Sequence, residues 1–66
     1  MDKIFCMNVR RIRKMRNMTQ RSVAKRLGVV NSCYANWEQG RTEPNIEMLR
    51  KLAEIYCVQV DQLIKE

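Results

Sequence analysis

The sequence predicts an all-α fold in which five short helices pack into one compact domain. Apolar residues recur at helical spacing along most of the chain, and no stretch alternates between apolar and polar residues for long enough to indicate a strand. Residues that start or stop helices separate the apolar stretches at short intervals. Because the 66 residues include only two Gly and one Pro, the connections between helices must be short.

Capping and stop signals place the helix boundaries. The N-cap candidates are Asp2, Thr19 and Asn45, and the candidate helix ends are Asn17, Gly28 and Gly40. These signals predict a third helix over residues 31–39, and Pro44 prevents it from continuing into the fourth. After a break at residues 57–59, a short last helix is expected to begin at Val60 or Asp61.

Apolar stripes on these helices predict the core. Their members are Phe5, Val9, Ile12, Val23, Ala24, Leu27, Ile46, Leu49, Leu52, Ala53, Tyr56, Val60, Leu63 and Ile64. Tyr34 and Trp37 are three residues apart, and their spacing faces the stripes of the first and fourth helices. We therefore interpret both as core residues rather than as aromatics that stack on bases. The five Met residues are expected to pack as well.

Composition argues against an enzyme, a metalloprotein and a membrane protein. The chain is long enough for one small domain over residues 1–66, with little room for a catalytic cleft. Three Cys and no His leave a zinc site short of ligands, so the Cys residues are expected to be small apolar residues in a reducing compartment. No apolar run reaches membrane-spanning length, and the N-terminus lacks a signal-peptide core. We expect a cytoplasmic protein without metal, cofactor or small-molecule ligand.

The charge is concentrated in the first part of the chain. Residues 1–27 contain nine of the 13 Lys and Arg residues but only one of the seven Asp and Glu residues. Such a distribution is typical of a protein that binds a polyanion, including nucleic acid. The alternative is that the basic residues of the first helix form only a solvated surface.

The stretch from Met18 to Gly40 has the anatomy of a helix-turn-helix motif, with its two helices at about residues 19–39. Ala24 is small, as required where two helices cross closely, and Gly28 lies where the chain turns sharply. Val29 follows as an apolar plug. In this motif the second helix enters the major groove of DNA.

This stretch and its flanks resemble the Cro/repressor-like (XRE-type) helix-turn-helix family. The matching motifs are Val-Arg-Arg-Ile-Arg at 9–13, Met-Thr-Gln at 18–20, Val-Ala-Lys-Arg-Leu-Gly-Val at 23–29 and Trp-Glu-Gln-Gly at 37–40. The resemblance runs without gaps from about residue 4 to 64. It implies a phage-repressor-like domain that binds double-stranded DNA sequence-specifically. The implied function is that of a small transcriptional regulator, a repressor, with recognition helix 31–39 in the major groove.

The resemblance also implies roles for individual residues. It implies that the residues that read bases are Asn31, Ser32 and Asn36. It implies that the residues that bind phosphates are Arg10, Gln20 and Arg41. Arg13 and Glu38 match an internal ion pair that links the first helix to the recognition helix. The chemistry agrees, since Asn can pair bidentately with adenine and an amide beside a helix N-terminus suits a phosphate.

Simpler interpretations of these residues stay open at this stage. Gln20 could be only a good helix-start residue, and Asn36 only a solvated one. Asn31 or Ser32 could cap the third helix, because Val30 stands at the usual cap position and cannot cap. These alternatives differ by one residue in the start of that helix.

The resemblance further implies a homodimer that binds a palindromic operator. We expect the dimer to form through the C-terminal helix, at Val60, Leu63 and Ile64, unless the core buries these residues. The alternative function is an antitoxin-like or other protein-interaction module whose main partner is a protein.

Overall fold

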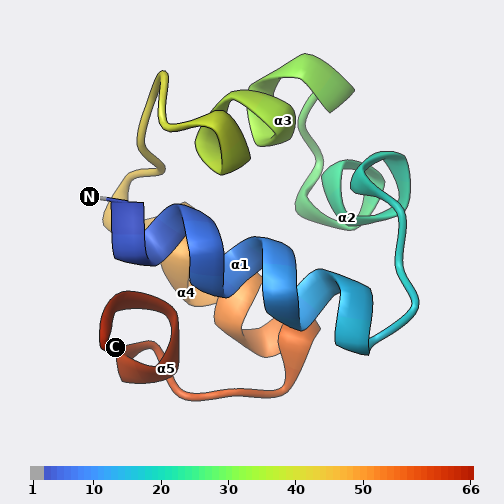
Figure 1. Ribbon diagram of the computed structural model, residues 1–66. Helices are drawn as coiled ribbons and strands as arrows, with labels where there is room; N and C mark the ends of the chain where they lie inside the picture. The colour runs from blue at the N-terminus through green and yellow to red at the C-terminus, as the bar shows by residue number, and fades with distance from the viewer. Residues whose placement is uncertain (1–2) are drawn as a thin grey trace.

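The computed structural model describes residues 3–66 and arranges five helices around a shared core (Figure 1). The helices are α1 (Lys3–Met15), α2 (Gln20–Leu27), α3 (Asn31–Gln39), α4 (Ile46–Tyr56) and α5 (Asp61–Ile64). Across residues 3–66 there is no strand, so the predicted all-α fold is confirmed. The predicted N-cap Asp2 lies outside the described residues.

The helix ends follow the predicted signals. The Thr19 and Asn45 side chains accept hydrogen bonds from the backbone N–H groups of Ser22 (3.0 Å) and Met48 (2.9 Å), which caps α2 and α4. Gly28 and Gly40 close α2 and α3 with φ of 79° and 77°. This left-handed backbone is accessible to Gly at little cost, which explains both glycines.

Within residues 3–66, two residues other than Gly also adopt the left-handed backbone. Asn17 has φ of 54° in the turn after α1, which agrees with its predicted role as a stop. Cys57 ends α4 with φ of 55°, and its side chain is exposed. All three Cys residues are free thiols, and Cys6 and Cys33 are partly buried.

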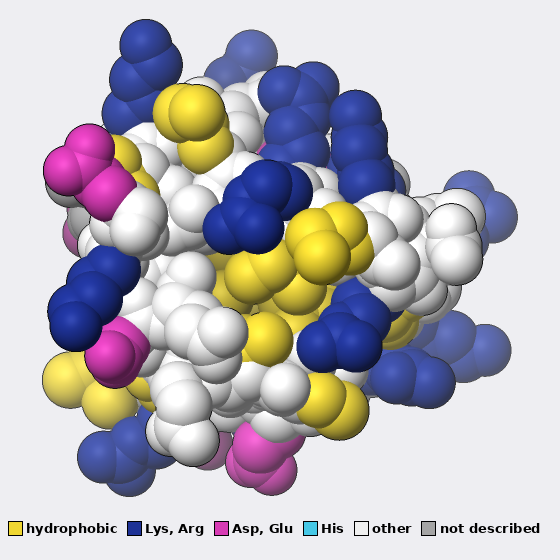
Figure 2. All heavy atoms as spheres, turned by 60° about the horizontal axis from the view of Figure 1, so that its bottom comes forward, with side chains coloured by type: hydrophobic (Ala, Val, Ile, Leu, Met, Phe, Trp, Pro, Cys, Tyr) yellow, Lys and Arg dark blue, Asp and Glu magenta, His cyan; other side chains and the backbone are white. Residues whose placement is uncertain are grey.

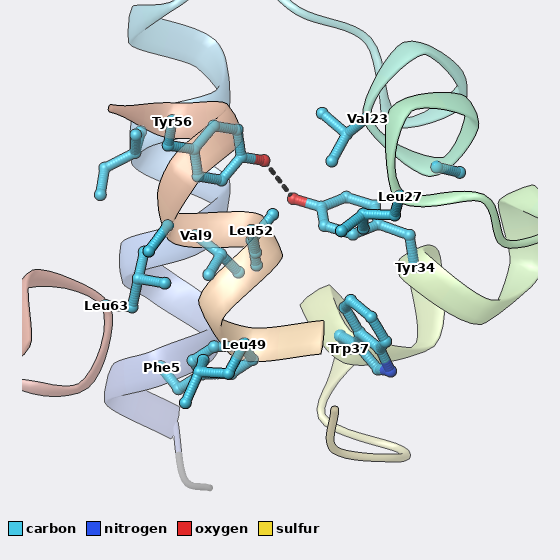
Figure 3. Close-up of a cluster of buried hydrophobic side chains, with 13 residues drawn as sticks. Phe5, Val9, Val23, Leu27, Tyr34, Trp37, Leu49, Leu52, Tyr56 and Leu63 are labelled. Carbon is cyan, nitrogen blue, oxygen red and sulfur yellow. Dashed lines mark hydrogen bonds between the residues drawn. The ribbon is translucent and has the colours of Figure 1, made fainter. Parts of the chain in front are cut away.

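The core is formed by side chains from all five helices (Figure 3). Tyr34 and Trp37 are buried, as predicted, and their rings meet edge to face with centroids 5.8 Å apart. The stripe of α4 begins at Leu49, not at Ile46, which lies 68% exposed in the first turn of the helix. Met7 and Met15 are also exposed, at 60% and 68%, so not all the Met residues pack in the core.

Helix α1 connects the two ends of the molecule, because it packs against both α3 and α5. In Figure 1, α3 lies at the top and α5 at the bottom. The buried Asn8 side chain of α1 donates to the backbone oxygens of Leu63 (3.2 Å) and Lys65 (2.6 Å). These two bonds fasten the last helix to α1 and leave α3 at the opposite end.

Candidate nucleic-acid interface

The outward side of α3 carries the residues predicted to read bases. Asn31 and Ser32 are exposed in its first turn, and Asn36 is partly exposed one turn beyond Ser32. Residues four apart on a helix lie on the same face, so Ser32 and Asn36 point in similar directions. Gln39, which sequence reasoning did not single out, is also exposed and extends this side of the helix. The sequence signal for Gln39 was its spacing of three residues from Asn36, which places both on the same side of a helix.

The structure shows which residue is the N-cap of α3. Val30 is the N-cap residue with extended backbone, and no side chain caps the helix there. Asn31 and Ser32 lie inside the helix, so they do not act as its N-cap. Their polar side chains are left exposed at the end of α3.

The three predicted phosphate-binding residues come from three segments around α3. Arg10 is exposed on α1, and Arg41 is exposed directly after Gly40. The Arg41 backbone N–H donates to the Asn36 carbonyl oxygen at 3.0 Å, which fixes the chain as it leaves α3. Gln20 is the first residue of α2, and its side chain is partly buried.

Arg13 and Glu38 form a bidentate ion pair between α1 and α3. The Arg13 Nε and Nη2 atoms donate to Glu38 Oε2 at 2.7 Å and to Oε1 at 3.2 Å. A third donor of the same guanidinium, Nη1, reaches the Met18 carbonyl oxygen at 3.0 Å. The two side chains are only 13% and 3% exposed, so this is a largely buried pair.

Glu38 has further partners that sequence reasoning missed. Gln20 Nε2 donates to Glu38 Oε1 at 2.9 Å, and the Tyr34 hydroxyl donates to Oε2 at 2.5 Å. The Tyr34 and Tyr56 hydroxyls are in turn 2.7 Å apart (Figure 3). One carboxylate thus connects α1, α2 and α3, and Tyr56 adds α4. For these further partners, the i, i+4 spacing of Tyr34 and Glu38 was the only sequence signal.

The network sets the ionisation states of its members. Burial alone would raise the pKa of Glu38, but the hydrogen bonds from Arg13, Tyr34 and Gln20 outweigh it and hold that pKa below its ordinary value. Burial raises the pKa of Tyr56 to about 12 and raises that of Tyr34 further. Around neutral pH, Glu38 is therefore a carboxylate and both hydroxyls keep their protons.

A second surface lies along α1 and includes Arg10. A shallow groove on α1 is lined by Met7, Asn8, Arg10, Arg11, Lys14 and Met15. It continues toward the C-terminus between Ile4, Met7 and Glu66. Figure 2 views the molecule from the α5 end and shows hydrophobic side chains gathered between Lys and Arg side chains.

Neither a cluster of metal-ligating side chains nor a helix that could span a membrane is found among residues 3–66. Among residues 3–66, no three Cys, Asp or Glu side chains come together in a way that could hold a metal ion. None of the helices in that range has the length and apolar character needed to cross a bilayer.

Comparison with known proteins gives the class. The helix-turn-helix family model matches residues 9–63, and the chain belongs to this family. Over 63 residues it is 32% identical to the cryptic phage CTXphi transcriptional repressor RstR of Vibrio cholerae. This alignment covers 96% of this chain and 57% of RstR. Over 62 residues it is 32% identical to YqaE, an uncharacterized HTH-type transcriptional regulator of Bacillus subtilis, covering 94% and 53%.

A solved structure supports the same class. The DNA-binding domain of the P22 c2 repressor superposes with a TM-score of 0.89 at 32% identity, over 98% of this chain and 87% of that one. The chain spans about half the length of the curated relatives it matches. These matches confirm the repressor-like helix-turn-helix fold, which is a fold of regulators and not of enzymes.

The buried pair generates a stability prediction. We expect Glu38→Ala to lower the free energy of unfolding by about 3–5 kcal/mol, because it leaves the Arg13 charge buried without a partner. Glu54→Ala removes an exposed carboxylate on α4 and should cost under about 1 kcal/mol. Urea melts at neutral pH measure both values. A Glu38→Ala melt that coincides with that of the wild type would contradict the prediction.

The same residue should also shape the pH dependence of stability. Because its folded pKa lies below the ordinary value of 4.5, Glu38 stabilises the fold fully above that pH, and the stabilisation is lost as pH falls through the folded pKa. In Glu38→Gln the group no longer titrates, so stability should fall less steeply on acidification than in the wild type.

Proposed function

We propose that this chain binds double-stranded DNA sequence-specifically and acts as a transcriptional regulator, most simply a repressor in the cytoplasm. The observation that carries the proposal is the arrangement around α3. Its outward side presents Asn31, Ser32 and Asn36, while Glu38 on the same helix is fixed to α1 and α2 by buried bonds. A rigid helix with exposed amide and hydroxyl groups suits the major groove.

In the proposed complex, α3 lies in the major groove and the neighbouring segments grip the backbone. Asn36 and Asn31 offer donor and acceptor pairs that match the edge of adenine, and Ser32 and Gln39 add single contacts. Arg10 on α1 and Arg41 directly after α3 supply exposed positive charge. Gln20 stands at the N-terminus of α2, where the helix dipole favours a phosphate.

We propose a homodimer as the binding unit, on a palindromic site. The predicted interface needs revision, because Leu63 is fully buried and Ile64 is the exposed apolar residue of α5 at 45%. The groove on α1 adds Ile4 and Met7 nearby, beside Glu66. A twofold axis could set the basic residues Arg11 and Lys14 of one protomer against the acidic C-terminal end of its partner.

Selection of DNA sequences by the purified protein tests the function directly, and a symmetric motif is expected. On that motif, Asn36→Ala should weaken binding by about 1–3 kcal/mol and relax the preference at one base position. Random DNA should be affected far less, because it lacks the matched base. Equal losses on selected and random DNA would show that Asn36 does not read bases.

Salt dependence tests the proposed phosphate contacts. Neutralising a phosphate releases counterions, so log K should fall with log salt by about 0.9 per contact. Arg10→Ala and Arg41→Ala should each reduce that slope by roughly one per subunit. Arg50→Ala, which removes an exposed cation from α4, is the matched control and should leave the slope unchanged. If all three variants keep the wild-type slope, the basic residues around α3 do not contact phosphates.

The dimer can be tested with a matched pair of exposed Ile residues. Ile64→Glu places a charge in the proposed interface and should weaken self-association about tenfold or more in sedimentation equilibrium. Ile46→Glu makes the same change at a 68% exposed position on α4 and should leave self-association as in the wild type. A dimer that tolerates both changes must use another surface.

A further inference from the structure

We propose that Tyr34 is a positioning residue for DNA binding, which acts through Glu38 to hold the Gln20 amide in the orientation that presents an N–H group to a DNA phosphate. The inference rests on the proposed phosphate contact of Gln20. In this inference, a buried tyrosine of α3 affects a phosphate contact that a residue of α2 makes.

The first step is that the Glu38 carboxylate is saturated. Oε2 accepts from Arg13 Nε and from the Tyr34 hydroxyl, and Oε1 accepts from Arg13 Nη2 and Gln20 Nε2. An ionised carboxylate offers about four lone-pair sites, so every site is occupied. The four donors together fix the position of the carboxylate, and the carboxylate in turn fixes each donor.

The second step fixes the orientation of the Gln20 amide. A carboxylate can only accept hydrogen bonds, so Gln20 must turn its nitrogen, and not its carbonyl oxygen, toward Glu38. One N–H of the amide is used there at 2.9 Å, and the second N–H is the donor left for a phosphate. Gln20 is also the first residue of α2, where its own backbone N–H has no acceptor within the helix. Side-chain and backbone donors are thus available at the same helix end.

The third step gives the hydrogen-bond chain a direction. Tyr34 has one hydroxyl proton and donates it to Glu38, so the bond between the two hydroxyls requires Tyr56 to donate to Tyr34. The order is Tyr56 to Tyr34 to Glu38. Only Tyr34 contacts the carboxylate, while Tyr56 is one bond further away. The two hydroxyls therefore have different effects on Gln20.

Tyr34→Phe should consequently weaken DNA binding, whereas Tyr56→Phe should not. The first change empties a site on Oε2 and lets the carboxylate shift against Arg13, which moves the acceptor that holds Gln20. The second change leaves all four donors of Glu38 in place. Each keeps the aromatic ring in the core and removes one buried hydroxyl, so Tyr56→Phe is a control matched in chemistry and in burial.

The experiment is a double-mutant cycle on DNA affinity at fixed salt, with the selected duplex and a random duplex as probes. The variants are Gln20→Ala, Tyr34→Phe, Tyr56→Phe and the Gln20→Ala/Tyr34→Phe pair, each measured well below its melting temperature. We expect Tyr34→Phe to weaken binding to both duplexes about threefold to tenfold, because a phosphate contact carries no sequence information. In the Gln20→Ala background the same change should have no further effect, since the side chain that it positions is gone.

The possible outcomes distinguish a failure of this inference from a failure of the proposed phosphate contact of Gln20. If Gln20→Ala weakens binding while Tyr34→Phe does not, or if the two losses simply add, Tyr34 does not position Gln20. If Tyr56→Phe weakens binding as much as Tyr34→Phe, the effect is one of general stability and the inference is overturned. If Gln20→Ala itself leaves affinity unchanged, the proposed phosphate contact is wrong and the positioning role is wrong with it.

A second variant is used if Tyr34→Phe unfolds at too low a temperature to assay. The double variant Tyr34→Phe/Tyr56→Phe removes both hydroxyls and should show the same loss of DNA affinity in a more stable protein.

Discussion

The buried carboxylate of Glu38 is the interaction on which the arrangement of the helices depends. Taking a charge out of water is costly, and only well-placed donors offset that cost. Here the donors come from α1, α2 and α3 itself, so the carboxylate is satisfied only when these three helices are correctly placed. A small core gives limited stability at this chain length, and a geometric requirement of this kind adds specificity to it.

The same interaction joins folding to the proposed DNA contacts. Glu38 lies on the inner side of the helix whose outer side carries Asn36, and Gln20 lies at the start of α2. The polar groups that would meet DNA are therefore supported by buried bonds one layer beneath them. A contact held in this way loses less conformational entropy on binding than one made by a free surface side chain.

Much of the fold could be predicted from the sequence because its signals are local. Thr19, Asn45, Gly28 and Gly40 each act within a few residues of the boundary that they mark, and the structure places the boundaries there. The error at Ile46 has a simple cause. It fits the apolar spacing of α4, but at the first position of that helix its side chain is 68% exposed, while Met48 and Leu49 in the same turn pack on the core.

The network around Glu38 could be predicted only in part. The pairing with Arg13 followed from the family resemblance. The contacts with Gln20 and Tyr56 join residues far apart in the chain, and they depend on the angles at which the helices cross. Neither residue has a sequence neighbour that would indicate a buried carboxylate. Such contacts follow from tertiary geometry, which apolar spacing and caps do not determine.

The uncapped start of α3 has a consequence for the thermodynamics of recognition. A side-chain cap stabilises a helix by about 1 kcal/mol, and α3 begins at the exposed Val30 without one. Its first turn, which carries Asn31 and Ser32, is thus the part of the helix held least firmly by its own bonds. A duplex that supplies acceptors there would complete this turn as it binds. The hydrogen bonds formed there would contribute to DNA affinity, whereas in a capped helix the same N–H groups contribute to folding stability.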